Sequence, residues 1–192
     1  MKNKGHLIIF VKQPTMGKVK TRLAADIGTV KATFWYRWQL HSLLRTFKGP
    51  LPYSKHLFVS PQSGLQYFKP YQNKGWRVSL QSHGDLGQRM AEAFLTVGAG
   101  PRLLIGSDIP AISKQHIELA FEQLMSADAV FGPAEDGGYW LIGLGRFVRP
   151  PVLNNIRWSS DYALSDTLNK FGSDIRTEYL PILSDVDRGS DL

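Results

Sequence analysis

The chain contains no cysteine among its 192 residues. This absence excludes a disulfide framework, a zinc site built on thiolates and a cysteine nucleophile. It is also consistent with a reducing compartment, so we expect a cytoplasmic protein.

Long hydrophobic runs are missing as well. No stretch approaches the roughly 20 apolar residues that a membrane-spanning helix needs. The apolar run at 7–11 is too short for a signal peptide, and no small-residue cleavage site follows it. The sequence therefore predicts neither a membrane span nor a secretory signal.

Acidic side chains are fewer than basic ones: 16 Asp and Glu against 23 Lys and Arg, for a net charge of +7. This surplus suits anionic partners such as nucleic acid, phosphorylated metabolites or an acidic membrane face. The basic residues are spread along the chain, and no helix-turn-helix, zinc-finger or RNA-recognition motif is present. Nucleic acid is therefore the least favoured of these partners, and a small phosphorylated ligand is preferred.

Apolar runs and helical patterns alternate along the chain, without a linker, repeat or low-complexity segment. Such alternation predicts an α/β sheet covered by helices on both faces, and the length fits one domain over residues 1–192. The predicted strands are 6–11, 56–59, 76–80, 103–105, 129–131, a strand from Tyr139 onward, and an edge strand at 179–183 that contains Pro181. The predicted helices are one from about Val19, then 29–47, 61–71, 86–97, 113–124 and 161–171.

A buried strand ending at Ile105 leads directly into Gly106, Ser107 and Asp108. Pro110 prevents the strand from continuing, so the Asp108 carboxylate is expected at the carboxyl tip of a central strand. Ligands of open α/β sheets bind at that edge, and a carboxylate there can hold a divalent metal against a phosphate. A helix cap or a simple turn residue is the structural alternative.

The first strand is followed by a glycine-containing loop and a helix start. This arrangement presents free backbone N–H groups to an anion. Its spacing matches neither the Walker A motif nor the dinucleotide fingerprint. A solvated basic turn is the alternative interpretation, but four clustered cations favour a phosphate site. The predicted contacts are Lys12, Gly17, Lys18, Lys20 and Arg22.

Two glycines also flank Asp85, which precedes a predicted helix. Asp85 can cap that helix or contact a base or ribose, and Arg89 can pair locally or meet a phosphate. Both are retained as candidate nucleotide-binding residues.

Carboxylates also stand beside two further strand ends. Glu135 and Asp136 precede Gly137-Gly138, a pattern that a hairpin turn explains without any function. Asp185 and Asp187 follow the last predicted strand.

Several segments, taken together and in this order, resemble a bacterial family of uncharacterised transferases assigned to the glycosyltransferase-A (GT-A) superfamily. Its remoter similarities are to the guanylyltransferase that activates phospholactate and to molybdopterin nucleotidyltransferases, although Arg188-Gly189-Ser190 stands where Thr-Pro-Glu is usual in the latter. The segments are Lys12-x-Pro-x-x-Gly-x-Val-Lys-Thr-Arg-Leu23, Gly84-Asp-Leu-Gly-x-Arg-Met90, Gly106-Ser-Asp-Ile-Pro110, Gly132-Pro-x-x-Asp-Gly-Gly-Tyr139, Trp158-Ser159 and Asp185-Val-Asp187.

The resemblance implies a three-layer α/β/α, Rossmann-like GT-A fold, mostly parallel with one antiparallel strand. It implies a nucleotide in the N-terminal half, and Mg²⁺ or Mn²⁺ held by Asp108. Asp187, and less favourably Asp185, would be the second metal ligand, and Asp136 would be a metal ligand or a base near the acceptor.

Two reactions fit this resemblance. The favoured one is glycosyl transfer from a nucleotide-diphospho-sugar, with Asp136 or Glu135 as the base for an acceptor hydroxyl. The other is nucleotidyl transfer from a nucleoside triphosphate to a phosphorylated small molecule, which needs no base. A binding protein on a transferase scaffold is the third hypothesis.

Overall fold

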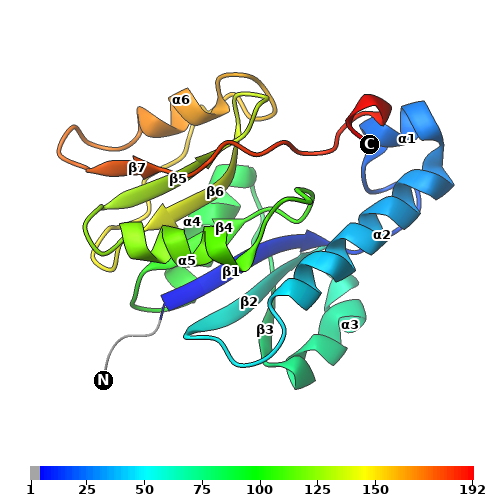
Figure 1. Ribbon diagram of the computed structural model, residues 1–192, viewed down its shortest axis with the longest axis horizontal. Helices are drawn as coiled ribbons and strands as arrows, with labels where there is room; N and C mark the ends of the chain where they lie inside the picture. The colour runs from blue at the N-terminus through cyan, green and yellow to red at the C-terminus, as the bar shows by residue number, and fades with distance from the viewer. Residues whose placement is uncertain (1–4) are drawn as a thin grey trace.

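The computed structural model describes residues 5–192 and contains a seven-stranded sheet of order β3-β2-β1-β4-β6-β5-β7 (Figure 1). The strands are β1 (Gly5–Lys12), β2 (Tyr53–Ser60), β3 (Trp76–Leu80), β4 (Arg102–Ile105), β5 (Ala129–Pro133), β6 (Tyr139–Leu144) and β7 (Thr177–Tyr179). The helices are α1 (Thr21–Ile27), α2 (Thr29–Thr46), α3 (Gly64–Phe68), α4 (Leu86–Thr96), α5 (Lys114–Gln123) and α6 (Ala163–Leu168), with 3₁₀ turns η1 (Lys69–Lys74) and η2 (Gly189–Asp191).

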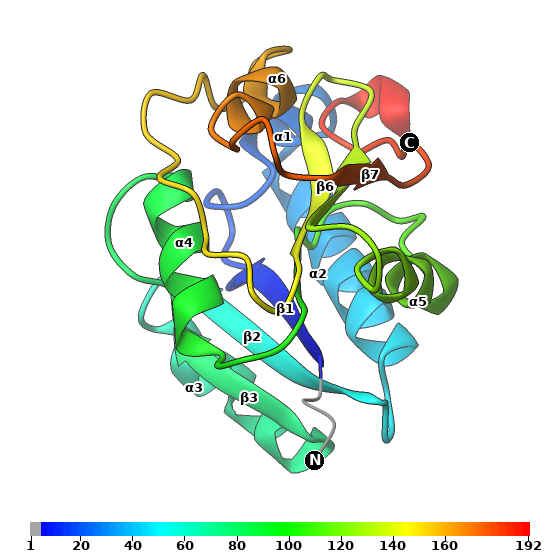
Figure 2. The same ribbon diagram turned by 90° about the vertical axis from the view of Figure 1, so that its left-hand side faces the viewer.

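The central strand β1 is buried on both faces, which explains its nearly unbroken apolar sequence. Leu7, Ile9 and Val11 pack in the core beneath α2, α3 and α5. Ile8 lies in a second core beneath α4, on the opposite face. Figure 2 shows α4 on one side of the sheet and α2 and α5 on the other. The three-layer α/β/α prediction is therefore confirmed.

The strand directions confirm the mostly parallel sheet with one antiparallel strand. β1 pairs in parallel with both β2 and β4, and β2 pairs in parallel with β3. β6 alone runs antiparallel to its neighbours β4 and β5. The predicted hairpin around Asp136 joins β5 to β6.

The order in which strands are added to the sheet reverses between β1 and β4, which are neighbours in the sheet. β2 and β3 are added on one side of β1, and β4 is then placed on the other. A crevice outside the carboxyl ends of the strands forms at such a point. Residues that follow β1 and β4 therefore border the candidate site.

Some element boundaries differ from the predicted ones. Proline accounts for two of the differences because it lacks the amide that a helix or ladder requires. Pro70 divides the predicted helix at 61–71 into α3 and η1. Pro181 follows β7, which ends at Tyr179, although the amides of Leu180 and Leu183 still donate to β5.

Two helix ends also require correction. α1 begins at Thr21 instead of near Val19, because Lys20 adopts a left-handed conformation at the cap. α6 is shorter than the predicted 161–171, and Asp166 in its first turn pairs with Arg157 of the preceding loop. None of the helices within residues 5–192 combines the length and hydropathy required to cross a bilayer.

The β1–β2 pair contains two buried histidines in contact. His6 Nδ1 lies 3.1 Å from His56 Nε2, and the two side chains are almost fully buried. Burial, with a smaller contribution from His6, lowers the pKa of His56 to about 4. Folding therefore favours the neutral imidazole of His56. Below the ordinary histidine pKa of 6.5, the unfolded chain binds a proton that the folded chain does not, and the free energy of unfolding falls.

We predict that His56→Gln reduces the loss of stability in acid. The wild-type pair penalises folding as the pH falls from about 6.5 toward 4, by about 2 kcal/mol. Urea unfolding at pH 7 and pH 4.5 measures this difference. Equal losses for the variant and the wild type would contradict the assignment.

Candidate functional site

Asp108 is positioned by the residues on either side of it, just after β4. Ser107 is buried and its hydroxyl lies 3.0 Å from the Tyr36 hydroxyl of α2. Ile109 is also buried in the core. Because these neighbours are anchored inside the protein, the carboxylate between them is left at the surface of the crevice, as the sequence predicted.

The other two carboxylates come from the C-terminal segment, which crosses the molecule to α1 (Figure 1). Val186 is buried against Leu23 and Ala32, between α1 and α2. Asp185 and Asp187 stand on either side of Val186 in the sequence, and the carboxylates of both lie near the Lys20 ammonium. The segment is fixed to α1, because the Gly189 amide donates to Asp26 Oδ2 at 2.9 Å.

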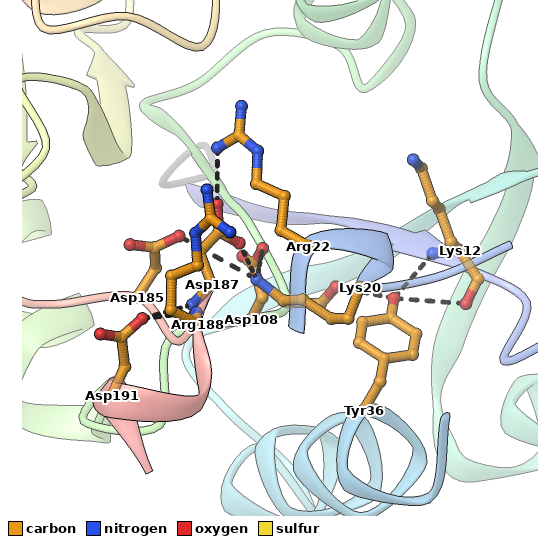
Figure 3. Close-up of polar contacts among 10 residues, drawn as sticks. Lys12, Lys20, Arg22, Tyr36, Asp108, Asp185, Asp187, Arg188 and Asp191 are labelled. Carbon is orange, nitrogen blue, oxygen red and sulfur yellow. Dashed lines mark hydrogen bonds and ion pairs between the residues drawn. The ribbon is translucent and has the colours of Figure 1, made fainter. Parts of the chain in front are cut away.

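Lys20 joins the three carboxylates (Figure 3). Its Nζ lies 2.9 Å from Asp108 Oδ2, 2.7 Å from Asp187 Oδ1 and 4.0 Å from Asp185 Oδ2. The Lys20 side chain is only 6% exposed. Its backbone has φ 45°, a left-handed conformation that costs a residue with a Cβ about 1 kcal/mol or more. One oxygen from each Asp lies within 4.8 Å of the others, a spacing at which the three carboxylates could together hold a cation.

The cluster changes the protonation of its members. Burial opposes charge on Lys20, but the facing carboxylates Asp108 and Asp187 outweigh it and raise the lysine pKa. Burial also opposes charge on Asp187, yet the hydrogen bonds from Lys20 and Arg22 lower its pKa overall. Burial and the neighbouring Asp187 raise the pKa of Asp185 to about 6. One ammonium therefore does not satisfy three carboxylates.

The cluster borders a crevice made of adjoining hollows. The central hollow, of about 300 Å³, is lined by Arg22, Asp108, Asp136 and the two C-terminal carboxylates. A neighbouring hollow of about 410 Å³ also includes Asp108 and extends to Lys12, Lys20 and Arg89. A third, of about 800 Å³, includes Glu135 and Asp136 and opens beside η2. The crevice has space for a ligand on each side of Asp108.

The turn before β6 places Asp136 at the wall of the crevice. Asp136 Oδ1 accepts the Gly138 amide at 2.9 Å, and the side chain is exposed. Gly137 has φ 77°, and a Cβ there would lie 2.3 Å from the Asp161 carbonyl oxygen. Glycine is therefore required for the turn to pack against the residues before α6.

Of the remaining predicted residues, some lie at the crevice and others lie outside it. Lys12 ends β1 at the crevice, with its side chain apart from the carboxylate cluster (Figure 3). Arg89 also lines the crevice, where its Nη1 donates to Gln81 Oε1 at 2.9 Å. Gly17 and Lys18 lie on the exposed loop before α1, outside the three hollows described above.

Asp85 forms the helix cap that the sequence offered as its structural role. Its Oδ1 accepts a hydrogen bond from the Gln88 backbone amide, and the Asp85 backbone amide donates to Gln88 Oε1. This capping box accounts for one side-chain oxygen. Its contact to a base or ribose stays a prediction.

The sequence did not mark two further residues of the crevice, Tyr36 and Trp158, as parts of the site. The Tyr36 hydroxyl accepts the Lys12 amide at 3.0 Å and thereby connects the ends of β1 and β4. Trp158 lines the central hollow, and its buried indole N–H has no hydrogen-bond partner within residues 5–192. Tyr36 falls within the predicted helix 29–47, and nothing in the sequence marked its hydroxyl as a bridge.

Comparison with known families and structures adds to this geometry. The family described as "Uncharacterized protein conserved in bacteria (DUF2064)" matches residues 44–160. No curated protein shows significant similarity to the chain.

Solved structures share the whole architecture. A candidate nucleotide-diphospho-sugar transferase from Desulfovibrio desulfuricans G20 is 32% identical, with TM-score 0.87, over 98% of this chain and 84% of that one. The 4-diphosphocytidyl-2C-methyl-D-erythritol synthase of Anaerococcus prevotii DSM 20548 has 10% identity and TM-score 0.60, over 98% and 94% of the two chains. The manganese complex of Rv0371C from Mycobacterium tuberculosis H37Rv has 14% identity and TM-score 0.56, over 98% and 96%. The last two show the shared fold alone.

We predict that Asp185→Asn stabilises the protein at pH 7.5 by about 1–2 kcal/mol, after allowance for solvent screening. The raised pKa of Asp185 means that its ionised form opposes folding, an effect present at neutral pH and lost below about pH 4. Urea unfolding at pH 7.5 and pH 4 measures both limits, with exposed Asp174→Asn as the control. Destabilisation at pH 7.5 would show that the carboxylate supports the fold.

Proposed function

The chain belongs to the DUF2064 family, and on that premise we propose that it is a metal-dependent glycosyltransferase that uses a nucleotide-diphospho-sugar. The relative at 32% identity supports the transferase class and this type of donor. The acceptor is a small molecule with a hydroxyl group. The observation that carries the proposal is the carboxylate cluster of Asp108, Asp185 and Asp187 at the switch point of the sheet.

The donor set fits Mg²⁺ or Mn²⁺. Three carboxylate oxygens are hard ligands that suit these ions, and the cluster contains no thiolate or imidazole. The Lys20 ammonium already occupies the space among the carboxylates as an internal cation. A bound ion supplies charge stabilisation for a departing diphosphate.

The cations around the crevice supply the second part of diphosphate binding. Lys12, Arg22 and Arg89 line the hollows on either side of Asp108, and Lys20 lies between them. Fixed positive groups stabilise the charge that develops on a leaving diphosphate. The nucleotide is therefore proposed to lie across the carboxyl ends of β1 and β4, with Gly17, Lys18 and Asp85 at its exposed margin.

The opposite wall carries the proposed base. Asp136 is exposed and lines both the central hollow and the hollow beside η2. In the transfer, the acceptor oxygen bonds to the anomeric carbon while the bond from that carbon to the diphosphate oxygen breaks. Asp136 receives the hydroxyl proton, with neighbouring Glu135 as the other candidate.

Nucleotidyl transfer is the second candidate, and the cation-rich first loop favours it. An ionised phosphate attacks the α-phosphate of a nucleoside triphosphate and releases pyrophosphate, so that reaction needs no base. A protein that binds nucleotide without turnover is the remaining hypothesis.

The first test is calorimetric titration with nucleoside diphosphates, triphosphates and nucleotide-sugars, each with Mg²⁺, Mn²⁺ or chelator. We predict that binding of one nucleotide-sugar requires metal and that Asp108→Asn weakens it at least tenfold. The loss reflects a missing charged ligand, which is typically worth about 1.5–3 kcal/mol. Asp174→Asn, far from the crevice, is the matched control. Unchanged metal dependence in Asp108→Asn would contradict the proposed site.

A second substitution separates the two reactions. We predict that Asp136→Asn retains donor binding but lowers the turnover of glycosyl transfer by about 10²–10⁴-fold, because the hydroxyl proton loses its acceptor. Glu135→Gln is the neighbouring control in steady-state kinetics. Full turnover in Asp136→Asn, with pyrophosphate released from a triphosphate, would instead identify a nucleotidyltransferase.

A further inference from the structure

The positive charge of the protein is concentrated in one part of the chain. Between Asp26 and Asp85 there is no acidic residue, although this stretch contains eight of the 23 Lys and Arg residues. The rest of the chain carries 15 basic and all 16 acidic residues and is nearly neutral. The stretch comprises α2, β2, α3, η1 and β3, which form one end of the sheet and part of the layer that covers it.

The outer face of α2 combines these cations with exposed apolar side chains. Val30, Phe34 and Trp38 follow one another at four-residue spacing and are 52%, 63% and 61% exposed. Arg37, His41 and Arg45 form a parallel row at the same spacing, and Lys48 follows the helix. Residues three or four apart are neighbours on a helix surface, so Phe34 lies beside Arg37 and the two rows are adjacent. Figure 1 shows α2 along the outside of the molecule.

A shallow groove of about 690 Å³ continues this surface toward η1, where Lys74 adds a further cation. Beyond Lys48 and Lys74 a second hollow extends to Arg77. Within residues 5–192, Arg37, Arg45, Lys48 and Lys74 form no ion pair with a carboxylate. Lys55 is different, because it is buried and donates to the carbonyls of Phe47 and Gly49. The exposed cations are therefore available to an external anionic surface.

We propose that the outer face of α2 docks the protein on an anionic lipid bilayer. An apolar row beside a cationic row is the arrangement by which a surface helix engages the headgroup region. Trp38 and Phe34 would enter the interface, while Arg37, Arg45 and Lys48 meet acidic headgroups. The inner face of α2 stays in the protein core, so this is a peripheral attachment.

Charge also argues against a second copy of the chain as the partner. A two-fold interface on this face would bring the cations of both copies together without any carboxylate between them. A single-stranded nucleic acid would use cations and aromatic faces. It would not use exposed Val30, and Tyr71 and Trp76 of the groove are buried.

The test is flotation with vesicles of phosphatidylcholine alone or with 30% phosphatidylglycerol at physiological salt. We expect binding only to the anionic vesicles, and a loss of roughly 100-fold in the partition coefficient for Arg37→Gln/Arg45→Gln/Lys48→Gln, since each cation contributes roughly fivefold. The matched control, Lys114→Gln/Arg146→Gln/Arg149→Gln, removes the same net charge elsewhere and is expected to lose less than about fivefold. Phe34→Ser/Trp38→Ser is expected to lose about tenfold or more because both apolar side chains leave the interface.

Three results would overturn the proposal. They are equal losses in the two triple variants, no binding to anionic vesicles, and a wild-type dimer that Phe34→Ser/Trp38→Ser converts to a monomer. A parallel measurement with a fluorescent 20-nucleotide RNA would reassign the face to nucleic acid if the RNA bound through Arg37, Arg45 and Lys48 while vesicles did not. Each arm uses the full chain and is independent of catalysis.

Discussion

The ion pairs of Lys20 hold together parts of the protein that are distant in sequence. The Lys20 ammonium, just before α1, lies between Asp108 after β4 and Asp187 in the C-terminal segment. Without a cation there, three half-buried carboxylates would repel one another across the switch point of the sheet. Burial, together with repulsion from Asp187, still raises the pKa of Asp185 with Lys20 in place. The crevice therefore needs a positive charge at this position, which is the property that a metal-dependent transferase would use.

Much of the architecture follows from the sequence because strand burial and helical periodicity are local signals. The three-layer sheet, its antiparallel strand and the position of Asp108 at a strand end were all predicted and are confirmed. The ends of α3 and β7 were not predicted well, since they depend on Pro70 and Pro181. The pairing of Lys20 with Asp187 could not be predicted either, because its partners are 167 residues apart and Lys20 had been assigned to phosphate.

Two kinds of electrostatic organisation coexist in the molecule. At the crevice, opposite charges are held close together and partly buried, where their interaction is strong. On the outer face of α2, cations are exposed and unpaired, so their effect is felt only within about 8 Å at physiological salt. The sequence-based view that the basic residues are spread along the chain missed this division. The absence of Asp and Glu between Asp26 and Asp85 was the signal that could have revealed it.

The most direct test of the carboxylate cluster is a crystal structure of the protein with Mn²⁺, recorded with anomalous scattering. We expect one strong anomalous peak within coordination distance of Asp108 and Asp187, with the Lys20 ammonium displaced from between them. A map in which Lys20 keeps its position and no peak lies at the cluster, at a concentration where Mn²⁺ binds in solution, would show that the three aspartates are not a metal site. The three aspartates would then serve only to hold the C-terminal segment against α1.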